Sequence, residues 1–242
     1  MTEIQSPFFR RFRAAKVLTK AMLAFLFFLF SVQTGAKLDA AKLPQTAATV
    51  REFVPSGWEV EAQIVGDLNR DSVPDFAVTL VESMPANADK DNPPERERAL
   101  LILFKSTEGN FYRAALATKV LACTRCGGAF YGISETPTTV EIKNGVIVIQ
   151  QDYGSREMTK ETFRFRYDPE AQRFVLIGAD TETFDRMTGE GSTESTNFLT
   201  GTKLITKTKL SEQAGKKTLS NVKQSVSREK RFIEDVVRGY DQ

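Results

Sequence analysis

Residues 66–75 read Gly66-Asp67-Leu68-Asn69-Arg70-Asp71-Ser72-Val73-Pro74-Asp75, a polar loop set between two runs of residues that favour β-strands. The run before the loop is Trp58–Val65, and the run after it is Phe76–Val81. Both runs are rich in β-branched or aromatic side chains, which fit a pleated sheet. We therefore expect the loop to join two strands, and not two helices.

The loop carries oxygen-bearing side chains at regular spacing. If Asp67 is counted as the first position, such side chains recur at the third, fifth and ninth positions. Carboxylate and carbonyl oxygens at this spacing wrap a hard cation. The sequence therefore predicts a Ca²⁺ site, whose ligands are the side chains of Asp67, Asn69, Asp71 and Asp75 and the backbone carbonyl of Val73.

A second interpretation of the loop needs no metal. Asp and Asn side chains also accept hydrogen bonds from nearby backbone N–H groups, and so form Asx turns. Three carboxylates held close together repel one another without a cation, which favours the metal. If the loop binds Ca²⁺, we expect a weak affinity, with a Kd on the order of 10⁻⁴–10⁻³ M as in extracellular modules.

The rest of the chain shows short alternating segments and no long amphipathic helix. Asn144-Gly145, between two alternating apolar runs, is a strong hairpin signal. Residues 211–217 are predicted to be a loop, and residues 231–237 fit either a strand or a helix. Further strands are predicted over 99–104, 111–116, 138–143, 146–151, 161–167, 173–178, 180–186, 195–199, 203–207 and 219–226. This pattern predicts an all-β fold, arranged as an antiparallel sandwich, a meander or a partial propeller.

Residues 1–36 have the layout of an export signal. Basic residues precede the apolar run Ala21–Phe30, and small residues follow at Thr34–Ala36. The apolar run is shorter than the roughly 20 residues that span a bilayer, so we expect cleavage after Ala36 and no stable membrane span afterwards. The mature chain is expected to be exported, either to the periplasm or out of the cell.

We expect residues 37–56 to form a lead-in segment and residues 57–242 to form a single β-rich domain. Within that domain, residues 208–242 are more basic and are expected to form a peripheral C-terminal segment. Residues 1–36 hold five of the 33 basic residues and one of the 31 acidic residues, so the remainder is slightly acidic. Acidic residues are interspersed with the C-terminal lysines, so these lysines indicate a solvated face of the protein. No nucleic-acid partner is therefore expected.

The chain contains no histidine. This excludes Ser-His-Asp and Cys-His nucleophiles, histidine-bound zinc or haem, and acid–base catalysis by imidazole. Carboxylate pairs such as Glu157/Glu161 or Asp180/Glu182 would serve a glycosidase only at a set spacing across a cleft, which sequence does not reveal. A binding or structural role is therefore favoured over an enzymatic one.

Cys123 and Cys126 are the only cysteines. In an exported protein they are expected to form a structural disulfide that closes a tight turn. A thiol–disulfide exchange site is the alternative, but such sites stand at the start of a helix, and Gly127-Gly128 follows here in place of a helix former. A zinc site would need two further cysteine or histidine ligands, which the chain lacks.

The segment Gly66–Asp71 with Asp75, followed by an apolar strand, resembles the calcium loop of FG-GAP/VCBS-type repeats, known from β-propellers and many exported bacterial proteins. The likeness covers roughly 20–25 residues in one copy, whereas a propeller needs several repeated blades. The repeat pattern has Gly where this chain has Ser72, and a serine reaches the left-handed backbone region at a cost of about 1 kcal/mol.

More broadly, the chain is similar to a family of single-motif exported bacterial proteins of unknown function. The likeness is carried by the order of Trp58, the Asp67 loop, the segment Cys123–Gly128 and the segment Ser195–Gly201. This resemblance implies no activity.

The sequence thus predicts a non-enzymatic exported β-domain that acts as a binding or structural module in the cell envelope. Its expected partner is an envelope protein or a glycan. Two alternatives remain open: a thiol–disulfide exchange protein or redox partner that uses the CxxC motif, and a carbohydrate-binding module or hydrolase that uses Trp58, Tyr131 and Tyr153 as exposed aromatic side chains.

Overall fold

The computed structural model of the chain describes residues 38–211 and 215–239, so the predicted export signal over residues 1–36 lies outside the described residues. The strands are β1 (Thr46–Ala47), β2 (Trp58–Gly66), β3 (Asp75–Glu82), β4 (Arg98–Lys105), β5 (Phe111–Ala117), β6 (Thr138–Lys143), β7 (Val146–Gly154), β8 (Glu157–Asp168), β9 (Arg173–Asp185), β10 (Glu190–Asn197), β11 (Thr202–Ser211) and β12 (Gly215–Ser225). Short 3₁₀ helices are η1 (Ala40–Lys42), η2 (Val50–Phe53) and η3 (Ile233–Asp235). Among the described residues, no helix has the length and apolar character needed to cross a bilayer.

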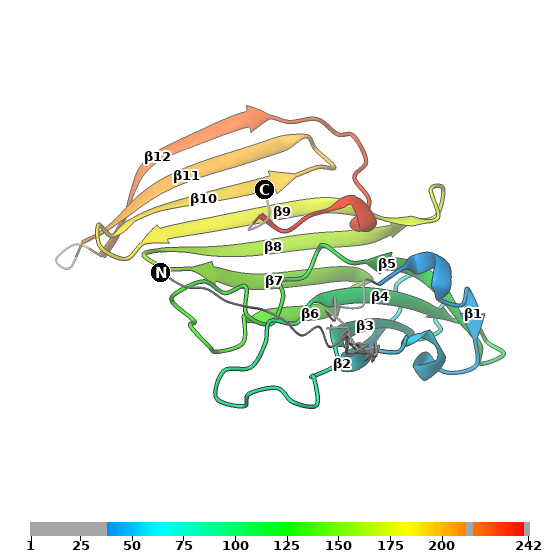
Figure 1. Ribbon diagram of the computed structural model, residues 1–242. Helices are drawn as coiled ribbons and strands as arrows, with labels where there is room; N and C mark the ends of the chain where they lie inside the picture. Colours follow the sequence, from blue (N-terminus) through cyan, green and yellow to red (C-terminus); the bar gives the residue numbers. More distant parts are fainter. Residues whose placement is uncertain (1–37, 212–214, 240–242) are drawn as a thin grey trace, which may run out of the picture. The chain divides into compact units, whose positions relative to one another are not determined.

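Two antiparallel sheets contain these strands (Figure 1). Sheet A has five strands in the order β1-β5-β4-β3-β2, and sheet B has seven in the order β12-β11-β10-β9-β8-β7-β6. Every strand of sheet B pairs with its neighbour in the sequence, which makes the sheet a meander. The predicted all-β antiparallel fold is confirmed, in the form of two meandering sheets that share a core.

Sheet A is buried on both faces, and alternate side chains of its central strands point into two different apolar clusters. In β4, Leu100 and Ile102 point into the core shared with sheet B, whereas Leu101 and Leu103 point the opposite way into a second cluster. Successive side chains of a strand face opposite sides of its sheet, so a strand covered on both sides needs apolar residues throughout. This explains the unbroken apolar run of β4.

The second cluster is covered by residues that precede β2. Leu43 and Phe53 are buried there, and they pack with the outward face of β3 and β4. β1 adds to the edge of the same sheet by pairing with β5. The segment predicted as a lead-in, residues 37–56, is therefore part of the domain in its described portion.

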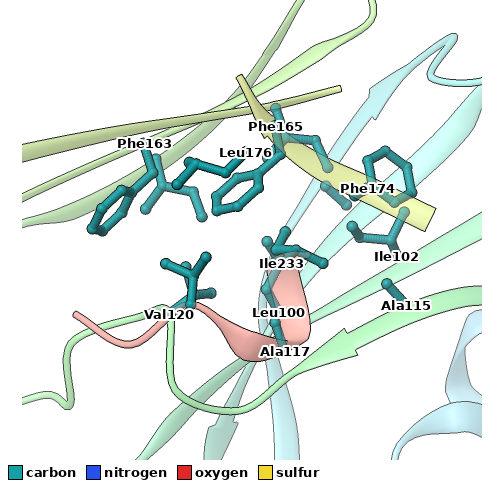
Figure 2. Close-up of a cluster of buried hydrophobic side chains, with 14 of the residues drawn as sticks. Leu100, Ile102, Ala115, Ala117, Val120, Phe163, Phe165, Phe174, Leu176 and Ile233 are labelled. Atoms are coloured by element: carbon teal, nitrogen blue, oxygen red, sulfur yellow. The ribbon is translucent and has the colours of Figure 1, made fainter. Parts of the chain in front are cut away.

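The main core lies between the two sheets (Figure 2). Phe163 and Phe165 of β8 face Leu100 of β4, and all are buried. Ile233, from the segment that follows β12, lies among these side chains and is fully buried. The sheets alone thus do not complete the core.

Residues 231–239, here called the C-terminal strap, close the seam between the sheets. The N–H of Leu176 donates to the carbonyl of Arg231 at 2.9 Å, and Val175 forms a β-bridge with Phe232. Further along, the N–H of Gly239 donates to the buried carboxylate of Glu161 at 3.0 Å. The predicted peripheral segment over residues 208–242 therefore contains the end of β11, all of β12 and a strap that is docked on the core.

Three local predictions differ from the structure. The strands predicted over 173–178 and 180–186 are one strand, β9, which accommodates one extra residue, Ile177, where its pairing with β8 shifts between Arg164 and Phe165. The loop predicted over 211–217 overlaps the ends of β11 and β12, with residues 212–214 outside the described part. Residues 231–237 form neither a strand nor an α-helix, since they contain an isolated β-bridge at Phe232 followed by the short 3₁₀ helix η3.

Candidate functional site

The predicted metal loop lies at one end of the two sheets, where alternate hairpin connections gather. A meander reverses direction at every strand, so the β2–β3 and β4–β5 connections share one end of sheet A, and the β6–β7, β8–β9 and β10–β11 turns share one end of sheet B. The N–H of Lys105 donates to Asp75 Oδ1 at 3.2 Å. A Cβ atom placed on Gly145, in the β6–β7 turn, would lie 3.3 Å from the carbonyl oxygen of Asp67. The two ends therefore coincide, and we call them the loop end.

Inside the loop, the polar side chains bind the loop's own backbone. Asp67 accepts hydrogen bonds from the N–H groups of Arg70 and Ser72, at 2.6 and 3.1 Å. Asn69 and Asp71 each accept one from the N–H two residues further on, at 3.0 and 2.7 Å. These are Asx turns, and they curl the oxygen atoms towards the inside of the loop.

Asp75 is the most constrained residue of the set, with no exposed surface. Its Oδ2 accepts from the N–H groups of Leu68 and Asn69 at 2.9 and 3.3 Å, and its Oδ1 accepts from Lys105. Burial raises the pKa of Asp75; the three hydrogen bonds oppose the rise, and the charge of Asp71 adds to it. Asp75 therefore ties the loop to β4 whether or not a metal is bound.

The backbone of the loop is left-handed at two residues that have side chains. Arg70 has φ 69° and Ser72 has φ 68°. Ser72 stands where the resembling repeats have glycine, so the chain adopts the turn expected of that pattern without the residue that adopts it most easily.

Ser72→Gly is expected to raise the free energy of unfolding by about 0.5–1 kcal/mol, because glycine adopts a positive φ without a steric cost and keeps the N–H that donates to Asp67. Urea unfolding followed by circular dichroism measures the change. Ser72→Ala is the matched control, since it removes the hydroxyl but keeps Cβ, and it should give no gain. Equal gains from both variants would contradict strain at this residue.

The donor types suit Ca²⁺, since the predicted ligands are carboxylate, amide and carbonyl oxygens. The carboxylate oxygens of Asp67, Asp71 and Asp75 lie further apart than they would around a bound ion. In the described structure, no three oxygens, one from each residue, lie within 4.8 Å of one another. Asp75 is held by its backbone donors, whereas Asp71 is exposed. The residues that would hold Ca²⁺ are the predicted Asp67, Asn69, Asp71, Val73 and Asp75, and binding would require the three carboxylates to move closer together.

Cys123 and Cys126 lie at the opposite end, in the connection between β5 and β6. Their sulfur atoms are bonded, with the Cα atoms 5.2 Å apart. Both residues are buried, and the chain between them forms a turn and not the start of a helix. The feature that activates a thiol in exchange proteins, a helix N-terminus, is therefore not found next to this pair in the described residues.

Two buried arginines surround the disulfide. Arg98 donates to the carbonyl of Cys123 at 3.4 Å and forms an ion pair with Glu61 at 2.6 Å. Arg238 of the strap donates to Cys126 Sγ at 3.5 Å. The carboxylate of Glu95 lies within 4.8 Å of both sulfur atoms, but sulfurs that are bonded to each other are not thiolate ligands for a metal. At this end of the molecule, the disulfide and the two arginines thus link several segments of the chain, which indicates a structural role.

The side chains considered for carbohydrate chemistry are mostly engaged elsewhere. Trp58 is 8% exposed and packs in the second cluster, so the expectation of an exposed aromatic side chain there is wrong. Glu161 is buried against Gly239, and Asp180 forms an ion pair with Arg164 at 2.7 Å. Tyr131 and Tyr153 are partly buried. Neither an aromatic platform nor a free carboxylate pair is formed by these residues.

Sequence reasoning missed a cavity of about 760 Å³ at the loop end. Arg70, Arg166 and Arg228 line it, together with apolar side chains of β9 and of the β10–β11 turn. These arginines are far apart in the sequence, and only Arg70 belongs to a recognised motif, so their meeting follows from the topology of the sheets.

No family model, no curated protein and no solved structure matches the chain. The likeness to FG-GAP/VCBS-type calcium loops therefore remains a prediction, carried by the loop residues alone.

Proposed function

We propose that the protein is an exported, non-enzymatic binding module of the cell envelope, and that Ca²⁺ stabilises its loop end. The observation that supports this most is the loop from Asp67 to Asp75. Its oxygen donors are turned inward by hydrogen bonds from the loop's own backbone, and its backbone adopts the left-handed turn at Ser72.

The distribution of polar groups favours binding over catalysis. The sequence has no histidine, and the buried carboxylates Asp75 and Glu161 are occupied by backbone N–H groups. Hairpin connections held at one end of a rigid β-scaffold are a common place for binding residues. An envelope protein or a glycan is the class of partner that suits an exported domain with such an end.

Calcium is expected to raise the melting temperature of the chelator-treated protein. With a Kd of about 10⁻⁴–10⁻³ M, 5 mM CaCl₂ would add about 1–2 kcal/mol of stability, or roughly 2–8 °C for a chain of this size. Differential scanning calorimetry in EDTA, and then with excess CaCl₂, measures the shift. A melting temperature that does not change would remove the metal from the proposal.

Two variants show whether the shift comes from this loop. Asp71→Ala removes an exposed ligand and should abolish the calcium shift while leaving the protein folded. Asp89→Ala is the matched control, because Asp89 also forms an exposed Asx turn, accepting from the N–H of Asp91 at 2.9 Å, but lies in the β3–β4 connection. A shift that survives in Asp71→Ala would place the calcium elsewhere.

A further inference from the structure

The cavity at the loop end is formed by parts of the chain that meet only in the folded protein. Its walls come from the β2–β3 loop, the end of β8 with the β8–β9 turn, the β10–β11 turn and the residues that follow β12. Its volume of about 760 Å³ lies within the range of small-molecule sites.

Three arginines line this cavity, and none has a carboxylate partner among the described residues. Arg166 on β8 stands between Val146 and Val175 of the neighbouring strands, so neither cross-strand neighbour can neutralise it. Arg228 donates to the carbonyl of Thr200 at 2.9 Å, which is a neutral acceptor. By contrast, arginines elsewhere such as Arg98, Arg156 and Arg164 bind carboxylates.

The position of Arg228 is fixed by the turn beneath it. Gly201 has φ +66°, and a Cβ atom on it would lie 3.0 Å from both Cγ and Nε of Arg228. The glycine thus lets the arginine side chain lie across the β10–β11 turn. One of the three guanidinium groups is therefore held at the cavity before any ligand arrives.

Three acidic residues also line the cavity, and one of them, Asp168, is already paired. Asp168 lies 2.5 Å from Lys230 Nζ and accepts hydrogen bonds from the N–H groups of Glu170 and Ala171. Glu170 and Glu229 are exposed side chains. The pairing of Lys230 with Asp168 removes one charge of each sign, so the three guanidinium groups outnumber the two remaining carboxylates, those of Glu170 and Glu229.

The rest of the wall is apolar. Val175 and Leu176 are buried members of the core that also border the cavity, and Leu199, in the β10–β11 turn, is 49% exposed. Phe198 lies beneath the guanidinium of Arg231, which stands 4.3 Å from the ring centroid. A ligand that filled this cavity would meet both cationic donors and hydrocarbon in its wall.

We propose that this cavity binds a small anionic amphiphile, with a phosphate or carboxylate head at Arg70, Arg166 and Arg228 and a non-polar body against Val175, Leu176 and Leu199. Guanidinium groups bind such heads through paired charged hydrogen bonds. This inference rests on the proposed binding role and gives it a ligand class. It does not depend on calcium.

The test is isothermal titration calorimetry of the full mature chain in EDTA-containing buffer, with three probes below their micelle concentrations. Octyl phosphate carries both head and body, inorganic phosphate carries the head alone, and octyl glucoside carries a neutral head. Octyl phosphate is expected to bind at least about tenfold more tightly than inorganic phosphate, because burying even a few methylene groups stabilises the complex. Octyl glucoside is expected not to bind.

Arg166→Gln and Arg70→Gln should each weaken octyl phosphate binding by about tenfold or more, since each removes a charged donor. Arg70 is on an exposed loop, so its variant is informative even if Arg166→Gln fails to fold. Arg186→Gln is the matched control: Arg186 is an exposed arginine that lies over Phe130 and does not line the cavity.

Three results would each overturn the proposal: no binding of octyl phosphate at millimolar concentration, equal binding by wild type and both cavity variants, or equal binding of octyl phosphate and octyl glucoside. Inorganic phosphate that bound as tightly as octyl phosphate would overturn the part of the proposal that concerns the apolar wall. Because EDTA is present throughout, a missing calcium shift in the melting experiment and a missing ligand in this one are separate failures.

Discussion

Asp75→Ala is expected to lower the free energy of unfolding by about 3–4 kcal/mol, measured by urea unfolding in EDTA. The variant leaves three backbone N–H groups, those of Leu68, Asn69 and Lys105, without the acceptor they share. Each unsatisfied buried donor costs about 1–3 kcal/mol, and the cost here is reduced to the extent that water enters the space left by the side chain. The loss should be accompanied by faster amide exchange of Leu68.

Two further substitutions separate this effect from the general loss of a loop carboxylate. Asp75→Asn keeps one acceptor oxygen and removes the charge of a carboxyl group whose pKa is raised by burial. It should therefore lower the free energy of unfolding by less than Asp75→Ala does. Asp71→Ala, at an exposed position with bonds only inside the loop, should cost less than about 1 kcal/mol. Equal losses for Asp75→Ala and Asp71→Ala would show that Asp75 does not tie the loop to β4.

Ile233→Ala is expected to lower the free energy of unfolding by about 3 kcal/mol. Ile233 is fully buried in the core between the sheets, so its truncation leaves a cavity lined by Leu100 and Phe165 in addition to losing buried hydrocarbon. Urea denaturation, with the same dependence of the unfolding free energy on urea concentration for both proteins, gives the difference in stability directly.

Ile133→Ala is the control for this substitution, because Ile133 is 59% exposed and its truncation should change stability by less than about 0.5 kcal/mol. The same loss in both variants would mean that the strap is not docked in solution as described. A loss confined to Ile233→Ala would show that residues after β12 belong to the cooperative unit.

The strands could be predicted because their signals are local. Residues 138–143 form β6 with the predicted bounds, since alternating apolar residues lead into Asn144-Gly145, a pair that adopts the positive φ values of a tight hairpin turn. The unbroken apolar run Ala99–Phe104 likewise indicated a core strand, which is β4. The alternation of apolar residues and the residue types of a turn are properties of a few adjacent residues, so both can be recognised in the sequence alone.

The contacts that complete the molecule have no such local signal. Leu43 and Phe53 lie in a segment of ordinary composition, and their burial depends on the outer face of sheet A being open to receive them. The continuity of β9 depends on its pairing with β8 on either side of an extra residue, Ile177.

For the candidate site, the oxygen-bearing residues could be found from their spacing. The bond between Asp75 and Lys105 and the meeting of three arginines at one cavity are set by the order of the strands.

The C-terminal strap makes closure of the core a long-range event. Arg238 binds the carbonyl of Leu121 across 117 residues, whereas sheet B is assembled from hairpins between consecutive strands. Hairpins form at little entropic cost, but docking the strap must overcome the entropy of closing a far longer loop. The meanders can therefore form first. Until the strap arrives, Leu100 and Phe165 border an open apolar seam, and it is in this interval that the chain is most prone to associate with other incompletely folded copies.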